Sequence, residues 1–183
     1  MLGTKPPGHI VAETDRLRLR RWHTADLCNL QGIFGDPAVM EYSDKGVMSQ
    51  QDQQDWLGRS CIAIYQDGLP GCLAIERKHD LAVIGYVGLS SDPSRVKPGD
   101  AEIGFRLARY AWNKGFATEA AIAILSTARE NSKLKRFIAI VDPNNRRSVR
   151  VITKLGMKLI GGIMLDGYDY PDHIYGRNAL PYA

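Results

Sequence analysis

The strongest constraint on the fold is a change of hydrophobic period between residues 101 and 141. The run Ala101–Leu107 alternates apolar and polar residues, as a half-buried strand does. From Ala117 to Ala128 the apolar residues instead recur at the i, i+3, i+4 spacing of a helix. Phe137–Val141 is then continuously apolar, which is typical of a parallel strand covered on both faces. Strand, helix and buried strand predict a βαβ unit.

The segments on either side extend this unit within one domain. The chain has 183 residues and no linker, repeat or low-complexity tract, which suits a single α+β domain with a mixed central sheet flanked by helices. Residues 1–12 are predicted to be a flexible N-terminal tail. Further strands are predicted at Cys72–Ile75, Ala82–Leu89, Lys158–Leu165 and His173–Asn178, and a further helix at Asn145–Leu155.

Composition excludes several classes of protein. Hydrophobic residues make up 44% and charged residues 24% of the chain, which excludes disordered, collagen-like and coiled-coil chains. No window is apolar enough for a membrane helix, and the N-terminal segment lacks the apolar core of a signal peptide. We therefore expect a cytoplasmic protein with no membrane contact. The three cysteines and four histidines are scattered, so no metal site is expected.

The positive charge points to an anionic partner. The formal net charge is +4, and the stretch Lys133–Lys158 holds eight lysines or arginines against one acid, Asp142. A solvated basic surface is the simpler interpretation of this stretch. A nucleic-acid-binding module would also account for the charge. The aromatic and basic interleaving of RNA-binding proteins is missing, however, so nucleic acid is an unlikely partner.

Three short segments could carry chemistry. On the strand Ala101–Leu107, Glu102 shares a face with Gly104, a bare position where a ligand can approach the backbone, so Glu102 is a candidate base. The segment Trp112–Ala120 opens a helix whose free N–H groups, with Lys114, could bind a pyrophosphate. The segment that follows Pro143 has two asparagines and Ser148 at a helix start. One asparagine would cap the helix, and the other amide and Ser148 could reach a ligand. Each segment also has a plain structural interpretation.

Together, these segments resemble a known family. AEIGF (101–105), WNKGFATEA (112–120), VDPNNRRS (141–148) and KLGM (154–157) occur in the order and spacing of the GNAT acetyltransferase superfamily. The opening ETDRLRLRRW (13–22) is similar to the branch typified by the ribosomal-protein N-terminal acetyltransferases RimJ and RimL. The resemblance covers nearly the whole chain, from about residue 13 to residue 179.

The resemblance implies an acetyl-CoA site and a fold with two splayed parallel strands. The family's pyrophosphate loop corresponds to Trp112–Ala117, with Trp112 in place of the usual Gln or Arg, and N–H groups from Asn113 to Thr118 would hold the diphosphate. The pantetheine arm would lie between the splayed strands, near Arg106 and Leu107, and would hydrogen-bond Asn145. The 3′-phosphate could bind any of four cations. The implied coenzyme-binding residues are Arg106, Leu107, Trp112, Asn113, Lys114, Gly115, Phe116, Ala117, Thr118, Asn145 and Ser148, and the 3′-phosphate candidates are Lys114, Arg146, Arg147 and Arg150.

The resemblance also implies catalytic roles. Glu102 aligns with the general-base glutamate of the histone acetyltransferase branch, and a strand N–H near Arg106 could stabilise the oxyanion. Ile152 stands where many family members have a tyrosine that acts as the general acid. Ser148 could protonate the thiolate in its place, or it could only contact the coenzyme or cap the helix. The C-terminal acids and tyrosines near the acceptor site could bind a cationic acceptor or replace Glu102 as base; they are Asp166, Asp169, Asp172, Tyr168 and Tyr170.

The expected reaction is the direct transfer of an acetyl group from acetyl-CoA to a primary amine. The amine could belong to a protein N-terminus or a small molecule, and transfer would occur in a ternary complex without a metal. The alternative is a non-catalytic acyl-CoA-binding or regulatory domain, which the missing tyrosine favours and Glu102 disfavours. Monomer and homodimer are both compatible with the sequence.

Overall fold

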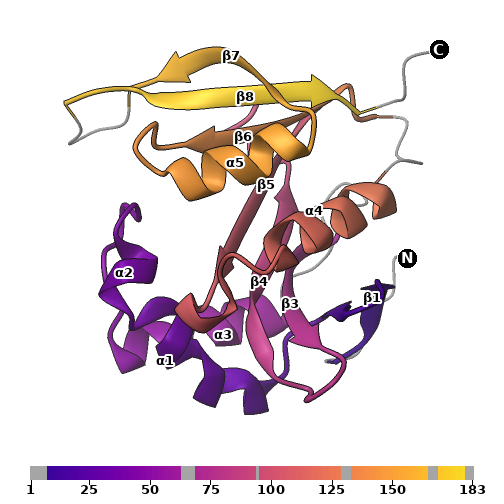
Figure 1. Ribbon diagram of the computed structural model, residues 1–183, viewed down its shortest axis with the longest axis vertical. Helices are drawn as coiled ribbons and strands as arrows, with labels where there is room; N and C mark the ends of the chain where they lie inside the picture. The colour runs from indigo at the N-terminus through magenta and orange to yellow at the C-terminus, as the bar shows by residue number, and fades with distance from the viewer. Residues whose placement is uncertain (1–7, 63–68, 94, 129–132, 165–168, 180–183) are drawn as a thin grey trace.

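The computed structural model describes residues 8–62, 69–93, 95–128, 133–164 and 169–179, which form one eight-stranded mixed sheet with helices on it (Figure 1). The order of strands across the sheet is β1-β2-β3-β4-β5-β6-β8-β7. The strands are β1 Ile10–Glu13, β2 Leu17–Arg20, β3 Gly71–Arg77, β4 Val83–Ser90, β5 Asp100–Leu107, β6 Arg136–Val141, β7 Lys158–Ile163 and β8 Asp172–Asn178. The helices are α1 Leu27–Phe34, α2 Pro37–Met40, α3 Gln50–Ile62, α4 Phe116–Thr127 and α5 Arg146–Lys154, with 3₁₀ turns η1 Thr24–Asp26 and η2 Arg109–Ala111.

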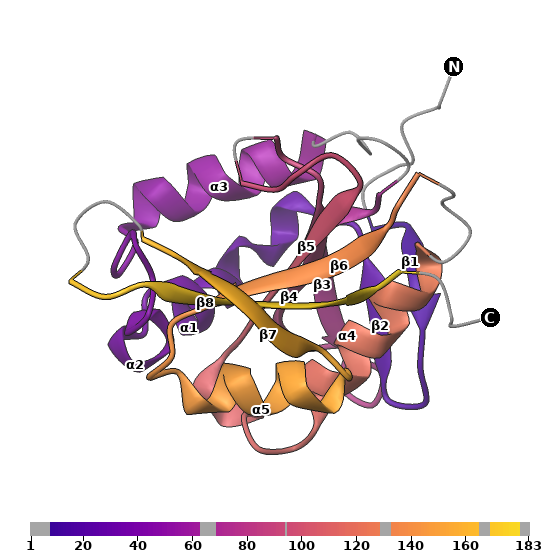
Figure 2. The same ribbon diagram turned by 90° about the horizontal axis from the view of Figure 1, so that it is seen from above.

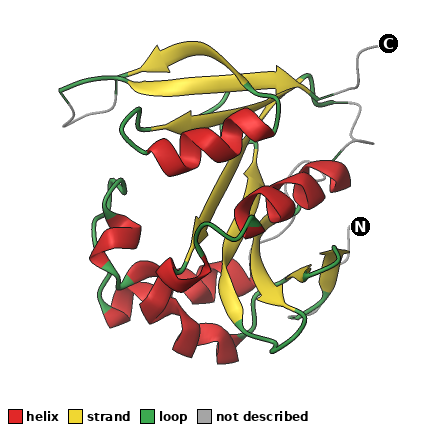
Figure 3. Ribbon diagram, in the orientation of Figure 1, coloured by secondary structure: helices red, strands yellow, loops and turns green. Residues whose placement is uncertain are grey.

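Helices cover both faces of the sheet, and Figures 2 and 3 show the resulting layers. On one face, α4 buries Ala120, Ala121 and Ile124 in the larger apolar core, and α5 lies beside it. On the other face, α1 and α3 pack around Trp22 in a smaller core. The Trp22 and Trp56 rings meet edge to face, with their centroids 5.0 Å apart. Apolar side chains are thus buried on both faces of the sheet, and this burial holds the sheet between its two layers of helices.

The predicted βαβ unit is present as β5, α4 and β6. β5 and β6 are parallel, whereas every other pair of neighbouring strands is antiparallel, so the sheet is mixed as expected. The observed bounds of β5 and β6 differ by one residue from the predicted ones, Ala101–Leu107 and Phe137–Val141. The change of hydrophobic period therefore located the centre of the fold correctly.

The N-terminal tail that we predicted over residues 1–12 needs a correction. Ile10–Ala12 belong to β1, which pairs antiparallel with β2 through Ile10↔Arg20 and Ala12↔Leu19. Val11 and Ala12 pack against the larger core, so burial and pairing fix this segment. Residues 1–7 lie outside the described residues. Within the described ranges, no helix has both the length and the apolar composition that crossing a bilayer requires.

Candidate coenzyme and acceptor site

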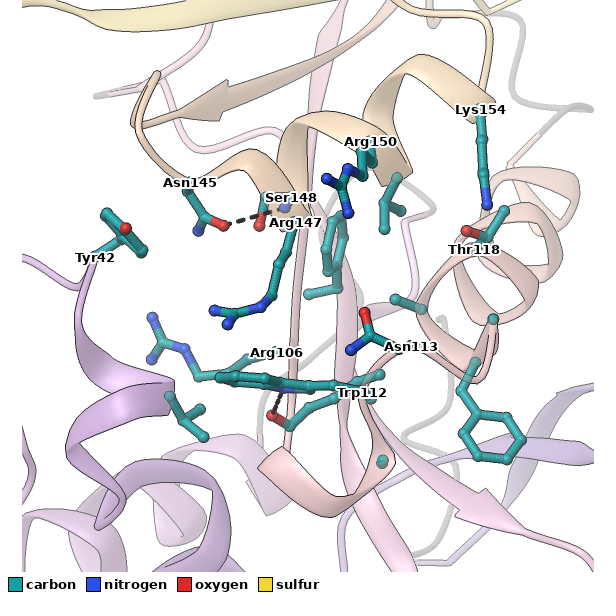
Figure 4. Close-up of a pocket in the computed structure, with 18 of the residues that line it drawn as sticks. Tyr42, Arg106, Trp112, Asn113, Thr118, Asn145, Arg147, Ser148, Arg150 and Lys154 are labelled. Atoms are coloured by element: carbon teal, nitrogen blue, oxygen red, sulfur yellow. Dashed lines mark hydrogen bonds between the residues drawn. The ribbon is translucent and has the colours of Figure 1, made fainter.

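A cavity of about 330 Å³ lies where β5 ends and where α4 and α5 begin (Figure 4). α2 and the residues after it, including Tyr42, close one end of the cavity. Among the described residues, its lining includes four cationic side chains and no carboxylate. A cavity with this charge suits a ligand with several negative groups. The cationic residues are Arg106, Arg147, Arg150 and Lys154.

The cavity exists because β5 and β6 separate along their length. Their parallel pairing is limited to Asp100↔Arg136, Ala101↔Phe137 and Glu102↔Ile138. Beyond Glu102, β6 continues beside β8, while Ile103–Leu107 of β5 have no strand partner on that side in the described part of the chain. The Leu107 carbonyl instead accepts a hydrogen bond from the Trp112 indole at 2.8 Å. The exposed backbone edge of β5 can therefore pair with an extended, amide-containing ligand.

The start of α4 is open toward the same cavity. Gly115 is the N-cap, with a left-handed φ of +81°, and it offers no side chain to the first turn of the helix. Asn113 is also left-handed, with φ of +58°, which turns the chain sharply after η2. The first-turn N–H groups of α4 are thus uncapped by a side chain, and with the helix dipole they form a site for a phosphate-type anion.

The turn between β1 and β2 clamps this loop, a feature that the sequence analysis missed. The Thr14 hydroxyl and the Arg16 backbone N–H both donate to Glu119 Oε1 on α4, and Arg16 Nε donates to Oε2 at 2.7 Å. Arg16 also donates to the Lys114 carbonyl at 3.1 Å and lies 4.6 Å from the centre of the Phe116 ring. Thr14 and Arg16 thereby tie Lys114, Phe116 and Glu119 to the edge of the sheet.

We expect Glu119→Gln to destabilise the protein and to flatten its acid response. Burial pushes the pKa of Glu119 upward, but hydrogen bonds from Thr14 and Arg16 outweigh it and hold this pKa below its ordinary value of 4.5. A lowered folded-state pKa stabilises above the unfolded value, and this contribution is lost as the pH falls through the folded one. The variant should lose about 1–2 kcal/mol of unfolding free energy at neutral pH.

Urea denaturation of wild type and Glu119→Gln from neutral pH to about pH 3 tests this expectation. The difference in their free energies of unfolding should be largest above pH 4.5 and should shrink below it. Glu13→Gln is the control, because Glu13 lies on β1 and its ion pairs with Arg18 and Lys78 are largely exposed. A difference that stays constant with pH would show that Glu119 contributes only its shape.

The start of α5 places two predicted residues beside the cavity. Asn145 is the N-cap, and its side-chain oxygen accepts a hydrogen bond from the Ser148 backbone N–H at 3.1 Å. Its side-chain amide is left to donate to a ligand, and the Ser148 side chain lines the same wall (Figure 4). The other asparagine, Asn144, does not line the cavity; its backbone N–H donates to Asp142.

Most predicted coenzyme-binding residues line the cavity, and Lys114 is the exception. Lys114 is exposed, and its carbonyl accepts a hydrogen bond from Arg16. Of the 3′-phosphate candidates, Arg147 and Arg150 line the cavity, whereas Lys114 and Arg146 do not; Lys154 lines it and was missed. Lys154 is one helical turn beyond Arg150, a spacing that could have revealed it. The predicted residues in the lining are Arg106, Leu107, Trp112, Asn113, Gly115, Phe116, Ala117, Thr118, Asn145 and Ser148.

Glu102 lies outside the cavity lining and is held by an arginine. Arg95 donates to both of its oxygens, from Nε at 2.8 Å and from Nη2 at 3.0 Å. The Glu102 side chain is 15% exposed, and its hydrogen bonds raise the pKa of Arg95. Gly104, two residues along the same face of β5, has open space where a Cβ would stand. A carboxylate beside a bare strand segment is thus available to an acceptor.

The predicted acidic region is only partly described. Asp166 and Tyr168 lie outside the described residues, and Asp169 is exposed. The Tyr170 hydroxyl donates to Asp142 at 2.9 Å. One oxygen of Asp172 is buried with no hydrogen-bond partner among the described residues, and burial with the nearby Asp142 raises the pKa of Asp172. Neither Asp142 nor Asp172 lines the cavity.

Comparison with known proteins shows which family the chain belongs to. Residues 16–158 match the acetyltransferase (GNAT) domain. The chain belongs to the GNAT acetyltransferase family. This GNAT protein is 28% identical over 172 residues to the uncharacterised N-acetyltransferase YoaA of Bacillus subtilis, covering 94% of this chain and 92% of the relative. The resemblance to GNAT proteins that the sequence motifs suggested is therefore confirmed.

Solved structures show the same GNAT fold. An acetyltransferase of the GNAT family from Bacillus anthracis superposes with a TM-score of 0.79 at 26% identity, covering 93% of this chain and 98% of that one. The ribosomal L7/L12 acetyltransferase RimL, solved in complex with coenzyme A, gives a TM-score of 0.74 at 18% identity, covering 93% and 98%. As a GNAT member, the protein is an acetyl-CoA-dependent acyltransferase. No group of three or more possible metal ligands occurs among the residues described.

Proposed function

We propose that the protein transfers the acetyl group of acetyl-CoA to a primary amine by direct attack in a ternary complex. This proposal rests on the cavity that joins the uncapped start of α4 to the unpaired edge of β5. The diphosphate lies against the N–H groups of residues 113–118, and the pantetheine arm lies along Ile103–Leu107 with the Asn145 amide. Arg150 and Lys154 bind the 3′-phosphate in this proposal, because both are on α5 and line the cavity opposite the open start of α4.

Glu102 serves as the base in this proposal. Amines have a pKa of about 8 at a chain terminus and about 10.4 in lysine, so an acceptor arrives mostly protonated. Glu102 accepts its proton, directly or through a water molecule, and the neutral amine attacks the thioester carbonyl. A backbone N–H of the open β5 edge near Arg106 stabilises the oxyanion. Arg95 keeps the carboxylate oriented between turnovers through its two hydrogen bonds.

Ser148 assists the leaving group in this proposal. Its hydroxyl lines the cavity at the first turn of α5, where the helix dipole also favours a departing anion. A thiol has a pKa of about 8.5, so the thiolate leaves readily once a single donor hydrogen-bonds it. Asn145 rather than Ser148 caps the helix through its side chain, which leaves the Ser148 hydroxyl free for this task.

Ser148→Ala is expected to lower kcat by about tenfold to a hundredfold, the effect of losing one hydrogen bond to a charged group, with little change in the unfolding midpoint. Steady-state release of coenzyme A, followed with a thiol reagent, measures the change. Ser148→Thr keeps the hydroxyl and should retain more activity than the alanine variant. Equal losses in the two variants would assign Ser148 a packing role.

Mass spectrometry of amines incubated with acetyl-CoA and the protein tests the proposed function. The panel includes peptides with free N-termini, polyamines, amino sugars and amino acids. Acetylated product that requires the protein is the expected result. Tight acetyl-CoA binding without any product would favour the alternative, a non-catalytic acyl-CoA-binding domain.

A further inference from the structure

One end of the cavity contains two arginine side chains that form no ion pair in the described part of the chain. Arg106 comes from β5 and Arg147 from α5, and both line the wall near Tyr42 (Figure 4). No ion pair joins either of them to any carboxylate among the described residues. Each is instead beside an aromatic ring. The Arg147 guanidinium carbon lies 4.4 Å from the centre of the Trp112 ring, and that of Arg106 lies 5.8 Å from the Phe34 ring.

The coenzyme contacts proposed near Arg106 involve the backbone of β5 and leave the Arg106 side chain without a role. Along β5, the side chains of Ile103 and Leu107 enter the larger core under α4, so the Arg106 side chain lies on the opposite face of the sheet. That face is covered by α1. The Arg106 guanidinium carbon lies near the ring of Phe34 on α1, and it lies 6.0 Å from the centre of the Tyr86 ring on β4. The helix α4, whose start is proposed to bind the diphosphate, packs in the larger core on the other face, although both line the same cavity. The Arg106 guanidinium is therefore on the α1 face of the cavity.

Arg147 turns toward the same space. It follows Asn145 at the first turn of α5, and it is stacked over Trp112 rather than pointing along the helix toward Arg150 and Lys154 (Figure 4). Two guanidinium groups in one half-enclosed cavity repel each other, which is a cost that an anion removes. Arg147 lies close against the Trp112 ring, and Arg106 lies near the rings of Phe34 and Tyr86. These contacts leave the N–H edges of both guanidinium groups free for two-point hydrogen bonding to a carboxylate or phosphate.

We propose that Arg106 and Arg147 form an anion-recognition site for the acceptor, so that the substrate is an amine that also carries a carboxylate or phosphate group. The inference rests on the proposed function, because it concerns the acceptor of that reaction. Glu102 shares the face of Arg106 four residues earlier, about 13 Å along the strand. The amine end faces Glu102 and the anionic end faces the arginines, so several bonds separate the two groups in the preferred acceptor.

Matched pairs of amines test this inference. We would measure kcat/KM for ω-amino acids of increasing chain length against their methyl esters, and for phosphoethanolamine against ethanolamine. The anionic member of the best pair should be preferred by at least about tenfold, the usual effect of charge-assisted hydrogen bonds. The carboxylate and phosphate arms distinguish the two sources of the anion. Equal values within every pair that reacts would overturn the proposal.

Arg106→Gln supplies the decisive variant. It should bring the preference for the anionic member close to one, through a higher KM for the acceptor, while KM for acetyl-CoA stays unchanged. Arg59→Gln is the matched control, because Arg59 is exposed on α3 and lies outside the cavity lining. A uniform loss on anionic and neutral amines alike would show that Arg106 is only structural, and would contradict the proposal.

A binding measurement decides the matter if no member of the panel reacts. With coenzyme A at saturation, its own phosphate sites are filled, so inorganic phosphate or acetate reports on the remaining site. Either ion should raise the thermal midpoint above that in chloride of equal ionic strength, and Arg106→Gln and Arg147→Gln should abolish the difference. Identical midpoints in all three salts would overturn the inference. Failure to bind coenzyme A would instead contradict the proposed function.

Discussion

Glu102→Gln is expected to lower kcat by about a hundredfold to ten-thousandfold, the range that a positioned acid–base group contributes. The glutamine keeps the size of the side chain and can still accept a hydrogen bond from Arg95, so the strand should keep its geometry. It cannot take a proton from the acceptor at neutral pH. Binding of acetyl-CoA should be unchanged, because Glu102 does not line the cavity in which the coenzyme is proposed to bind.

Initial rates at saturating acetyl-CoA, with product identified by mass spectrometry, give the size of this effect. Glu13→Gln is the control for loss of one negative charge, since Glu13 is on β1 and does not line the cavity. A Glu102→Gln enzyme with nearly full turnover would refute the assignment. In that case Asp172→Asn becomes the next variant, because one buried oxygen of Asp172 has no hydrogen-bond partner among the described residues and burial raises the pKa of Asp172.

Thr118→Asp is expected to weaken acetyl-CoA binding by more than about a hundredfold. Thr118 lines the cavity in the first turn of α4, where the diphosphate is proposed to lie. Two unit charges about 4 Å apart repel by about 4 kcal/mol at an effective dielectric constant of 20. The same carboxylate is favourable for the free helix, because the dipole stabilises an acid in the first turn by about 0.3–1 kcal/mol.

The opposite signs of these two effects make the variant informative. Its thermal midpoint without ligand should equal or slightly exceed that of the wild type, while the upward shift with acetyl-CoA should vanish. Thr118→Val is the control, because it has nearly the same shape and no charge, and it should keep most of the affinity. Unchanged acetyl-CoA affinity in Thr118→Asp would place the diphosphate elsewhere.

Local sequence patterns predicted the centre of this fold and much of its cavity. The change of period between residues 101 and 141 identified β5, α4 and β6, because strand and helix periodicity is a property of neighbouring residues. The start of α4 could be identified from the segment Trp112–Ala117, again from neighbouring residues alone. Gly115 in this segment adopts the left-handed conformation and leaves the first turn of the helix without a side-chain cap. The resemblance to the GNAT family supplied the splay of β5 from β6.

Contacts between distant segments could not be predicted in this way. Arg16 and Glu119 are 103 positions apart, and nothing in either local pattern indicates that they meet. The Arg95 pair with Glu102 depends on how the loop after β4 folds back on β5. β1 was mistaken for a tail because four residues are too short for a clear alternation, and its order comes from pairing with β2.

Isothermal titration of the wild type and Thr118→Asp with acetyl-CoA tests the central claim most directly, because it asks whether this cavity is the coenzyme site. We predict saturable binding of one acetyl-CoA per chain in the wild type, competition by coenzyme A, and a loss of affinity of at least about a hundredfold in the variant. The absence of binding by the wild type, or equal affinities in the two proteins, would contradict the account.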